Sequence, residues 1–152
     1  MITVLDASVA LAWLADRADV TEAMLARHLF EEVDHFDLLV PQHWRVEVAN
    51  GMLRLQRAQL VSPAKVTLFA NQIEALAIES DKAHIPHRWA HIRLIALTHA
   101  LTAYDAAYVE LAMRSGGCLA TFDRKLADAA RACGIPIFGQ AHGIAEPIAA
   151  YG

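Results

Sequence analysis

Cysteine and surplus basic charge, two features that often reveal a protein's partners, are scarce in this chain of 152 residues. Its two cysteines, Cys118 and Cys133, form neither a CxxC pair nor a disulfide ladder, so we expect two free thiols in a reducing compartment. The formal net charge of −4 excludes nucleic-acid binding driven by bulk positive charge. Contact with RNA through scattered arginines stays open if divalent cations neutralise a cluster of acids.

Long apolar runs are absent as well, although 56% of the residues are hydrophobic. No run approaches the roughly 18 to 20 apolar residues that a membrane span requires, and we therefore expect no membrane partner. A predicted strand begins within two residues of Met1 and leaves no room for a secretory signal, so we expect a cytoplasmic protein. The length predicts a single domain over residues 1–152 with one sizeable core.

Short apolar runs alternate with longer periodic segments along the chain. Strands that alternate with helices predict right-handed crossovers and a parallel sheet, so the fold class is α/β with helices on both faces. The predicted strands cover residues 2–5, 37–40, 77–80, 119–122 and 135–138, the last of them at an edge of the sheet. The predicted helices cover about 8–14, 20–33, 42–58, 63–76, 88–100, 103–115 and 125–133.

Four acids occupy positions where such a fold exposes its chemistry. Asp6 and Asp123 follow directly on short apolar runs, which places both at the carboxyl ends of predicted strands, where parallel sheets bind ligands. Glu47 lies inside a predicted helix, and Asp105 lies at the start of another. Mg²⁺ and Mn²⁺ prefer hard oxygen ligands from Asp and Glu. The four acids together therefore predict a metal site.

Polar neighbours of these acids are candidate supporting residues. Ser8 comes two residues after Asp6, and Thr121 comes two residues before Asp123; their short hydroxyls could hold a ligating carboxylate or a water in place. Asn50 shares a helix face with Glu47 through three-residue spacing.

Each acid also has a structural explanation when it is taken alone. Asp6 and Asp123 could cap the helices that follow them, and Thr102 to Asp105 matches a capping box. Glu47 could belong to a solvated helix face. The coincidence of all four acids is harder to explain in this way.

The residues around the acids resemble the PIN-domain ribonucleases, and most closely the VapC toxin subunits of VapBC toxin–antitoxin pairs. Order and spacing agree over nearly the whole chain, and the resemblance implies a PIN-like three-layer α/β/α domain with a central parallel sheet of about four to five strands. The matching segments are VLDAS at 4–8, EVAN at 47–50, YDAAY at 104–108 and TFD at 121–123.

The resemblance also implies an activity and partners. It implies a Mg²⁺- or Mn²⁺-dependent endoribonuclease that acts on RNA, forms a homodimer and is held inactive by a small VapB-like antitoxin whose tail enters the acidic cleft. Asp6, Glu47, Asp105 and Asp123 would be the catalytic and metal-binding acids, and hydrolysis would leave 5′-phosphate and 3′-hydroxyl ends. Some members carry a further acid where this chain has Lys125, so a firmly held second metal ion is in doubt.

Three alternatives stay open on the sequence alone. An aspartyl-phosphate phosphotransferase would use Asp6, but it needs a carboxylate where this chain has Ser8. A catalytically silent PIN-like module could bind RNA or protein without turnover, although like charges in one pocket cost stability that a scaffold need not bear. His84, His87 and His91 have spacings that suggest zinc, but no fourth ligand lies at a plausible distance along the chain.

Overall fold

Four short parallel strands form the centre of the molecule. The computed structural model describes residues 1–140, so residues 141–152 of the predicted domain lie outside the described part. The sheet has the order β3-β2-β1-β4, and its three pairs of neighbouring strands are all parallel. Its strands are β1 (Ile2–Leu5), β2 (Asp37–Val40), β3 (Ile78–Ser80) and β4 (Cys118–Ala120).

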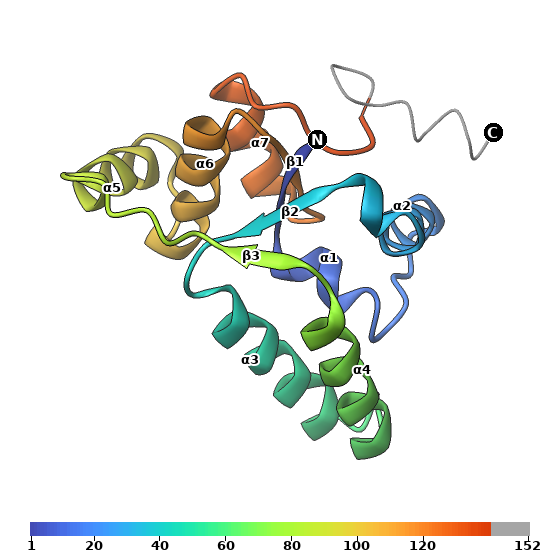
Figure 1. The fold of residues 1–152 in the computed structure, drawn as a ribbon. Helices are drawn as coiled ribbons and strands as arrows, with labels where there is room; N and C mark the ends of the chain where they lie inside the picture. The colour runs from blue at the N-terminus through green and yellow to red at the C-terminus, as the bar shows by residue number, and fades with distance from the viewer. Residues whose placement is uncertain (141–152) are drawn as a thin grey trace.

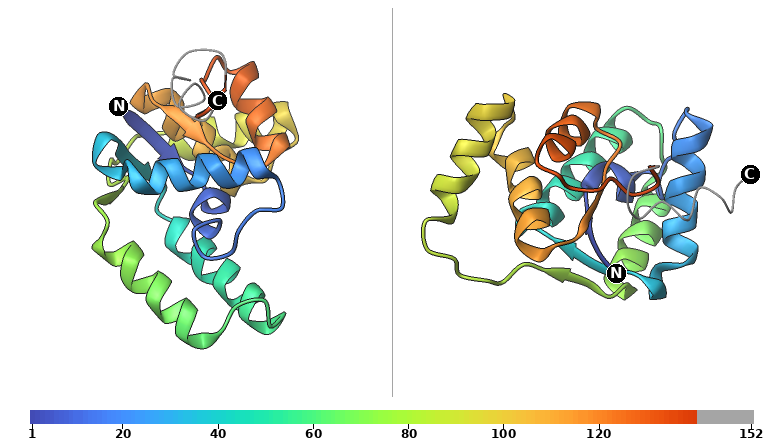
Figure 2. Two further views of the ribbon diagram at one scale, coloured as in Figure 1. Left: turned by 90° about the vertical axis from the view of Figure 1, so that its right-hand side faces the viewer. Right: turned by 90° about the horizontal axis from the view of Figure 1, so that it is seen from above.

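Helices cover both faces of this sheet, which makes the predicted three layers. In Figure 1, α5, α6 and α7 gather to the left of β1, α2 lies to its right, and α3 and α4 project below; the two views of Figure 2 show the same grouping. The helices are α1 (Ala7–Leu11), α2 (Val20–Glu31), α3 (Trp44–Arg57), α4 (Pro63–Ala75), α5 (Arg88–His99), α6 (Ala103–Ser115) and α7 (Arg124–Ala132), with a 3₁₀ turn η1 (Val33–His35) after α2.

Burial on both faces explains the composition of the central strands. Val4 and Leu5 of β1 and Cys118 and Leu119 of β4 are fully buried, as expected for strands covered by helices on both sides. Trp44, the first residue of α3, is also fully buried in this core. Within residues 1–140, no helix is long and apolar enough to cross a membrane.

The predicted fifth strand at residues 135–138 is wrong. Only an isolated parallel bridge joins Leu119 to Ile137, with hydrogen bonds from the Leu119 amide to the Pro136 carbonyl and from the Phe138 amide to the Leu119 carbonyl, both 2.9 Å long. Pro136 has no N–H to donate to a ladder, and Gly139 has a φ of 81° that turns the chain away. The segment therefore touches the edge of the sheet without extending it.

The predicted strand 119–122 also ends early, at Ala120, because the backbone amides that follow donate to side-chain hydroxyls and not to a neighbouring strand. The Thr121 hydroxyl accepts a hydrogen bond from the Asp123 amide, and the Ser8 hydroxyl accepts one from the Phe122 amide, each 3.1 Å long. Predicted helix 8–14 is shorter as well: α1 ends at Leu11, and the chain continues in tight turns to Leu14.

A glycine lets α3 approach α1 closely. Gly51 is buried, and a Cβ atom at that position would collide with the side chain of Leu11 on α1. This contact sets the distance between the helix that follows Asp6 and the helix that carries Glu47. It therefore controls how near the two acids lie.

Candidate functional site

Asp6 is the buried centre of the acidic cluster. It follows β1, its side chain is 6% exposed, and its amide donates to the Ala120 carbonyl of β4 at 2.9 Å. The hydroxyls of Ser8 and Thr121 donate to its carboxylate at 2.6 and 2.7 Å. Both bonds end on Oδ2, so the hydroxyls fix the orientation of the carboxylate and its second oxygen, Oδ1, is left for another ligand.

Ser8 and Thr121 also tie Asp6 to Asp123. Each hydroxyl donates to Asp6 and accepts an amide hydrogen from the turn between β4 and α7, at Phe122 and Asp123 respectively. A hydroxyl has one hydrogen to donate and two lone pairs to accept with, so each group here uses its donor and one of its two acceptor positions. The structure thus brings the two predicted supporting residues together, at the carboxyl ends of neighbouring strands.

The capping alternative applies to the acids unequally. Asp123 caps α7, because its Oδ1 accepts a 3.0 Å hydrogen bond from the Leu126 amide. Asp105 is half-buried in the first turn of α6, where its amide donates to the Thr102 hydroxyl at 3.1 Å. Asp6 makes no side-chain cap bond to α1. Capping therefore explains Asp123 in part, and it does not explain Asp6.

Glu47 is paired with His43, which lies on the same face at the start of α3. Its Oε1 lies 2.7 Å from Nε2 of His43, one turn earlier. The His43 ring makes edge contacts with Tyr104 and Tyr108 of α6, at centroid distances of 5.5 and 5.4 Å. The four-residue spacing that favours this pair is visible in the sequence, where His43 lies one helical turn before Glu47. Glu47 is thus held beside α6.

The charges of the four acids act on one another. Burial raises the pKa of Asp6 to about 6, and the negative charges of Glu47 and Asp105 add to this effect against the hydrogen bonds from the two hydroxyls. Burial also raises the pKa of Asp105, with further contributions from Asp123 and Glu47. The pKa of the Tyr108 hydroxyl rises because of burial and the nearby charges of Asp6 and Glu47. The structure therefore gathers Asp6, Glu47, Asp105 and Asp123 into one electronegative site.

Comparison with known proteins places the chain in a family. The sequence pattern of the PIN domain matches residues 3–132. The chain belongs to the PIN-domain family. It is 34% identical to Ribonuclease VapC3 from Pyrobaculum aerophilum over 132 residues, which cover 84% of this chain and 94% of that protein. The resemblance inferred from the four acidic segments is confirmed.

Two solved structures share the fold of this PIN domain. PAE2754 from Pyrobaculum aerophilum has a TM-score of 0.63 and 22% identity, with 90% of this chain and 92% of that chain covered. FitAcB from Neisseria gonorrhoeae has a TM-score of 0.57 and 22% identity, with 94% and 100% covered. Together with the parallel sheet between helical layers, these similarities confirm the predicted α/β/α architecture.

The donor chemistry of this PIN domain fits a hard divalent cation. Burial, with a smaller contribution from the charges of Glu47 and Asp105, raises the pKa of Asp6 to about 6, and a bound cation would favour the ionised carboxylate again. Among residues 1–140, no three His, Cys, Asp or Glu side chains converge closely enough to hold an ion together. Mg²⁺ keeps several waters and needs only one or two direct carboxylates, so this spacing still suits it, whereas zinc takes three or four direct protein ligands.

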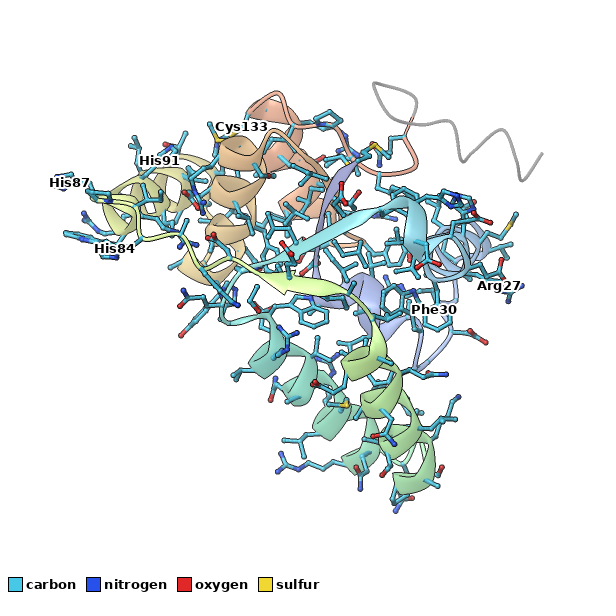
Figure 3. All side chains as sticks on the ribbon, in the orientation of Figure 1. Arg27, Phe30, His84, His87, His91 and Cys133 are labelled. Atoms are coloured by element: carbon cyan, nitrogen blue, oxygen red, sulfur yellow. The ribbon has the colours of Figure 1, made fainter. Side chains whose placement is uncertain are left out.

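The zinc alternative at the histidines has no support in the described part of the chain. His84, His87 and His91 are all exposed, and Figure 3 shows His84 and His87 at the outer end of α5, away from the sheet. These three histidines belong to residues 1–140, in which no group of three His, Cys, Asp or Glu side chains could hold a metal ion.

Asn50, predicted to support Glu47, lies one turn after Glu47 on α3 and is exposed.

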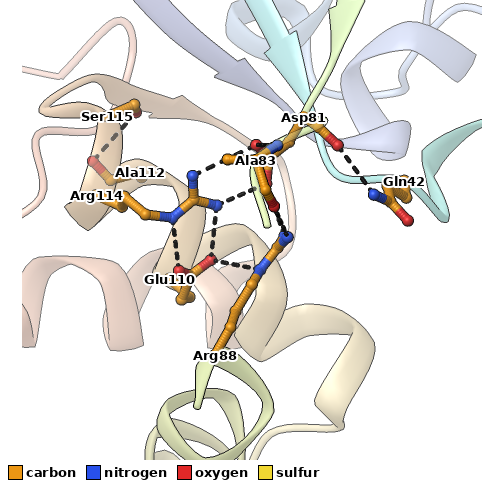
Figure 4. Close-up of polar contacts among 8 residues, drawn as sticks. All are labelled: Gln42, Asp81, Ala83, Arg88, Glu110, Ala112, Arg114 and Ser115. Atoms are coloured by element: carbon orange, nitrogen blue, oxygen red, sulfur yellow. Dashed lines mark hydrogen bonds and ion pairs between the residues drawn. The ribbon is translucent and has the colours of Figure 1, made fainter. Parts of the chain in front are cut away.

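A buried ion-pair cluster, drawn in Figure 4, is a feature that sequence reasoning missed. Asp81, just after β3, accepts from Arg114 at 2.6 Å and pairs with Arg88 at 2.8 Å. Glu110 of α6 pairs with the same two arginines, at 2.8 Å to Arg114 and 3.3 Å to Arg88. Burial would raise the pKa of Asp81, but Arg114, the Ala83 amide and Arg88 bring it below its ordinary value. The cluster locks α5 and α6, and so the helix of Asp105, to the end of β3.

A pocket of about 440 Å³ opens beside Asp123. Thr121 and Phe122 line it near the acids, and Arg124 and Arg131 bring positive charge to the same wall. Asp19, Glu22 and Asp128 line it as well, so arginines and acids share the surface of the pocket beside Asp123.

Proposed function

We propose that this PIN domain is a Mg²⁺- or Mn²⁺-dependent endoribonuclease. The observation that carries the proposal is Asp6, a carboxylate buried at the end of β1 among like charges and oriented by two hydroxyls. Such an arrangement costs stability, which a binding scaffold has no reason to bear. The 34% identity to a ribonuclease over most of both chains supports the same activity.

Asp6, Glu47, Asp105 and Asp123 would hold the metal ion. When bound, the ion would lower the pKa of a water and offset the negative charge of the phosphodiester. Lys125 stands where an additional acid could bind a second ion, so we propose one firmly held ion in each site.

The protein groups prepare the site before substrate binds. Ser8 and Thr121 hold the Asp6 carboxylate through Oδ2 and direct Oδ1 away from them. The Leu126 amide holds Oδ1 of Asp123 at the start of α7. Groups fixed in this way need little reorganisation when charge develops on the phosphate. The proposed products carry 5′-phosphate and 3′-hydroxyl ends.

Arg124 and Arg131 are candidates to hold the RNA backbone. Both line the pocket beside Asp123, and arginine suits phosphate because its planar group can donate two parallel hydrogen bonds. Arg131 is already engaged by Gln140 and Asp128, so Arg124 is the freer of the two. A strand that enters along this pocket passes Asp123, the one of the four acids that lines it.

The proposal includes toxin function and regulation by a VapB-like antitoxin. An electronegative site with a raised Asp6 pKa favours a partner that inserts an arginine or lysine. Such a side chain would pair with the acids and displace metal. A homodimer and a cytoplasmic location complete the proposal, the latter in keeping with two cysteines, Cys118 and Cys133, that form no disulfide.

Metal-dependent cleavage of RNA by the purified chain tests the activity. We expect cleavage in Mg²⁺ or Mn²⁺, none in EDTA, and none with the Asp6→Asn variant in either condition. Asp34→Asn is the matched control, because Asp34 is an exposed acid in η1 and lies outside the pocket beside Asp123. Equal cleavage by wild type and Asp6→Asn would refute the proposal.

A further inference from the structure

Tyr104 is an exposed aromatic residue next to a proposed catalytic acid. It precedes Asp105 in the first turn of α6, and 65% of it is exposed. The Thr102 hydroxyl caps this turn by accepting from the Asp105 amide, so the backbone that carries Tyr104 and Asp105 is fixed. An aromatic ring that stays exposed at a prepared site is a candidate contact for a ligand.

A chain of contacts holds the Tyr104 ring in place from one side. The ring of His43 lies 5.5 Å from it at an interplanar angle of 62°. His43 is itself held by Glu47, 2.7 Å from its Nε2, and by the edge contact with Tyr108. A ring that is held before binding loses little conformational entropy when a ligand stacks on it. His43 thus supports one side of the Tyr104 ring, and the rest of the ring is exposed to solvent as a platform on which a base could stack.

The chemistry of the neighbouring site selects the ligand. A phosphodiester at the acids places the base of an adjoining nucleotide one sugar away, and the Tyr104 ring contacts His43, whose Nε2 lies 2.7 Å from the Glu47 carboxylate. Bases of single-stranded RNA can splay out and stack on aromatic side chains. We propose that Tyr104, braced by His43, stacks against the base of a nucleotide that flanks the scissile bond of a single-stranded RNA. This inference rests on the proposed ribonuclease function.

Stacking contributes to RNA affinity without requiring one particular base, since every base has a π-face. Tyr104 therefore favours unpaired RNA over a duplex, whose bases are already stacked on one another. The same platform fixes the register of the strand on the acids. Sequence preference, in contrast, must come from other contacts.

Binding of short RNAs tests the platform. A single-stranded RNA decamer of mixed sequence is cut by wild type to map the scissile bond, and copies with one abasic position each are made around that bond. Their affinities are measured by fluorescence anisotropy in an Asp6→Asn background, which prevents cleavage. Tyr104→Ala should bind the intact decamer about five- to 150-fold more weakly, the range found for base–aromatic stacking. Tyr104→Phe should retain the affinity because it keeps the ring.

The abasic series separates stacking from a structural effect. One abasic position beside the cut should weaken binding by the Tyr104 protein and leave Tyr104→Ala unaffected, because the two changes remove the same contact. A 2-aminopurine at that position should be quenched on binding only when residue 104 is aromatic. Trp89→Ala is the matched control: Trp89 is 67% exposed, but at the start of α5 it follows Arg88, whose ion pairs are with Asp81 and Glu110 and not with the four acids.

Three outcomes would overturn the inference. If wild type cleaves RNA while Tyr104→Ala binds every RNA of the series as the parent does, the platform is refuted and the ribonuclease function stands. If Tyr104→Ala keeps its RNA affinity but loses a protein partner, Tyr104 belongs to a protein interface. If the wild-type chain neither cleaves nor binds RNA, the proposed function fails and the platform fails with it.

Discussion

Replacing Asp6 with asparagine should change how the stability of the protein depends on pH. Burial among like charges raises the pKa of Asp6 from an ordinary 3.8 to about 6 in the folded protein without metal. Each pKa unit corresponds to about 1.4 kcal/mol, so a shift of this size corresponds to about 3 kcal/mol. This is a large part of the typical stability of a domain, about 5–15 kcal/mol.

The sign of the effect follows from which state binds the proton. Below about pH 4, Asp6 is protonated in both the folded and unfolded chain, and its burial carries no penalty for charge. Between that pH and the folded-state pKa of about 6, only the unfolded chain releases the proton, so the free energy of unfolding falls as pH rises. Above the folded-state pKa the full penalty is present.

Asparagine has no charge to bury, so the variant escapes this loss. Its amide oxygen can accept the hydrogen bonds from Ser8 and Thr121, but its buried NH₂ group needs an acceptor, which costs about 1–3 kcal/mol if none is found. At pH 4 we therefore expect Asp6→Asn to be no more stable than wild type. Between pH 4 and pH 7, its free energy of unfolding should gain about 2.4 kcal/mol on that of wild type, because the unfolded chain is already partly ionised at pH 4.

Urea denaturation in EDTA at several pH values measures this difference. The exposed Asp128→Asn variant is the control and should follow the wild-type profile. A constant difference between Asp6→Asn and wild type across the whole pH range would refute the reasoning. It would mean that Asp6 is ionised in the folded protein as readily as in the unfolded chain.

Four further predictions test separate parts of the structure. Asp123→Ala should lose about 1 kcal/mol of stability through the lost cap on α7, whereas Asp123→Asn should keep it; equal loss in urea denaturation by both variants would argue against capping. Mg²⁺ or Mn²⁺ should raise the melting temperature of wild type by mass action, and an equal rise for Asp105→Asn across a metal titration would show that the site is misplaced. Glu110→Ala should destabilise the protein by about 1.5–3 kcal/mol, the usual worth of hydrogen bonds to charged groups, because Arg88 and Arg114 would then share the single carboxylate of Asp81; denaturation midpoints near wild type would contradict this. Expression of the chain alone should stop growth and co-expression with its antitoxin should restore it; normal growth with abundant soluble, metal-binding protein would count against a toxin.

Local signals explain why much of the fold is predictable from the sequence. The N-cap bonds of Asp19, Ser62 and Thr102 involve amides three residues later, so the starts of α2, α4 and α6 are visible in short segments. Strands buried on both faces appear as apolar runs. Asp6 follows directly on such a run, and its place at the carboxyl end of β1 is therefore predictable from a few neighbouring residues.

The features that sequence reasoning missed depend on distant partners. The segment 135–138 is apolar enough for a strand, but Pro136 and the turn at Gly139 limit it to one bridge with Leu119. Asp81 meets Arg114, 33 residues away along the chain, and no spacing rule predicts that contact. Likewise, the approach of Glu47 to Asp6 depends on the close packing of α1 and α3 at Gly51, a tertiary contact.

Mapping the ends of one cleaved RNA tests the central claim most directly. Catalysis by a metal ion held among four carboxylates leaves the substrate's 2′-hydroxyl out of bond formation, in contrast to ribonucleases that use it as the nucleophile. The account predicts 5′-phosphate and 3′-hydroxyl ends, formed only when metal is present and only by protein with Asp6 intact, and cleavage that persists when the nucleotide at the cut carries a 2′-deoxy substitution. A 2′,3′-cyclic phosphate, or cleavage that continues in EDTA, would contradict it.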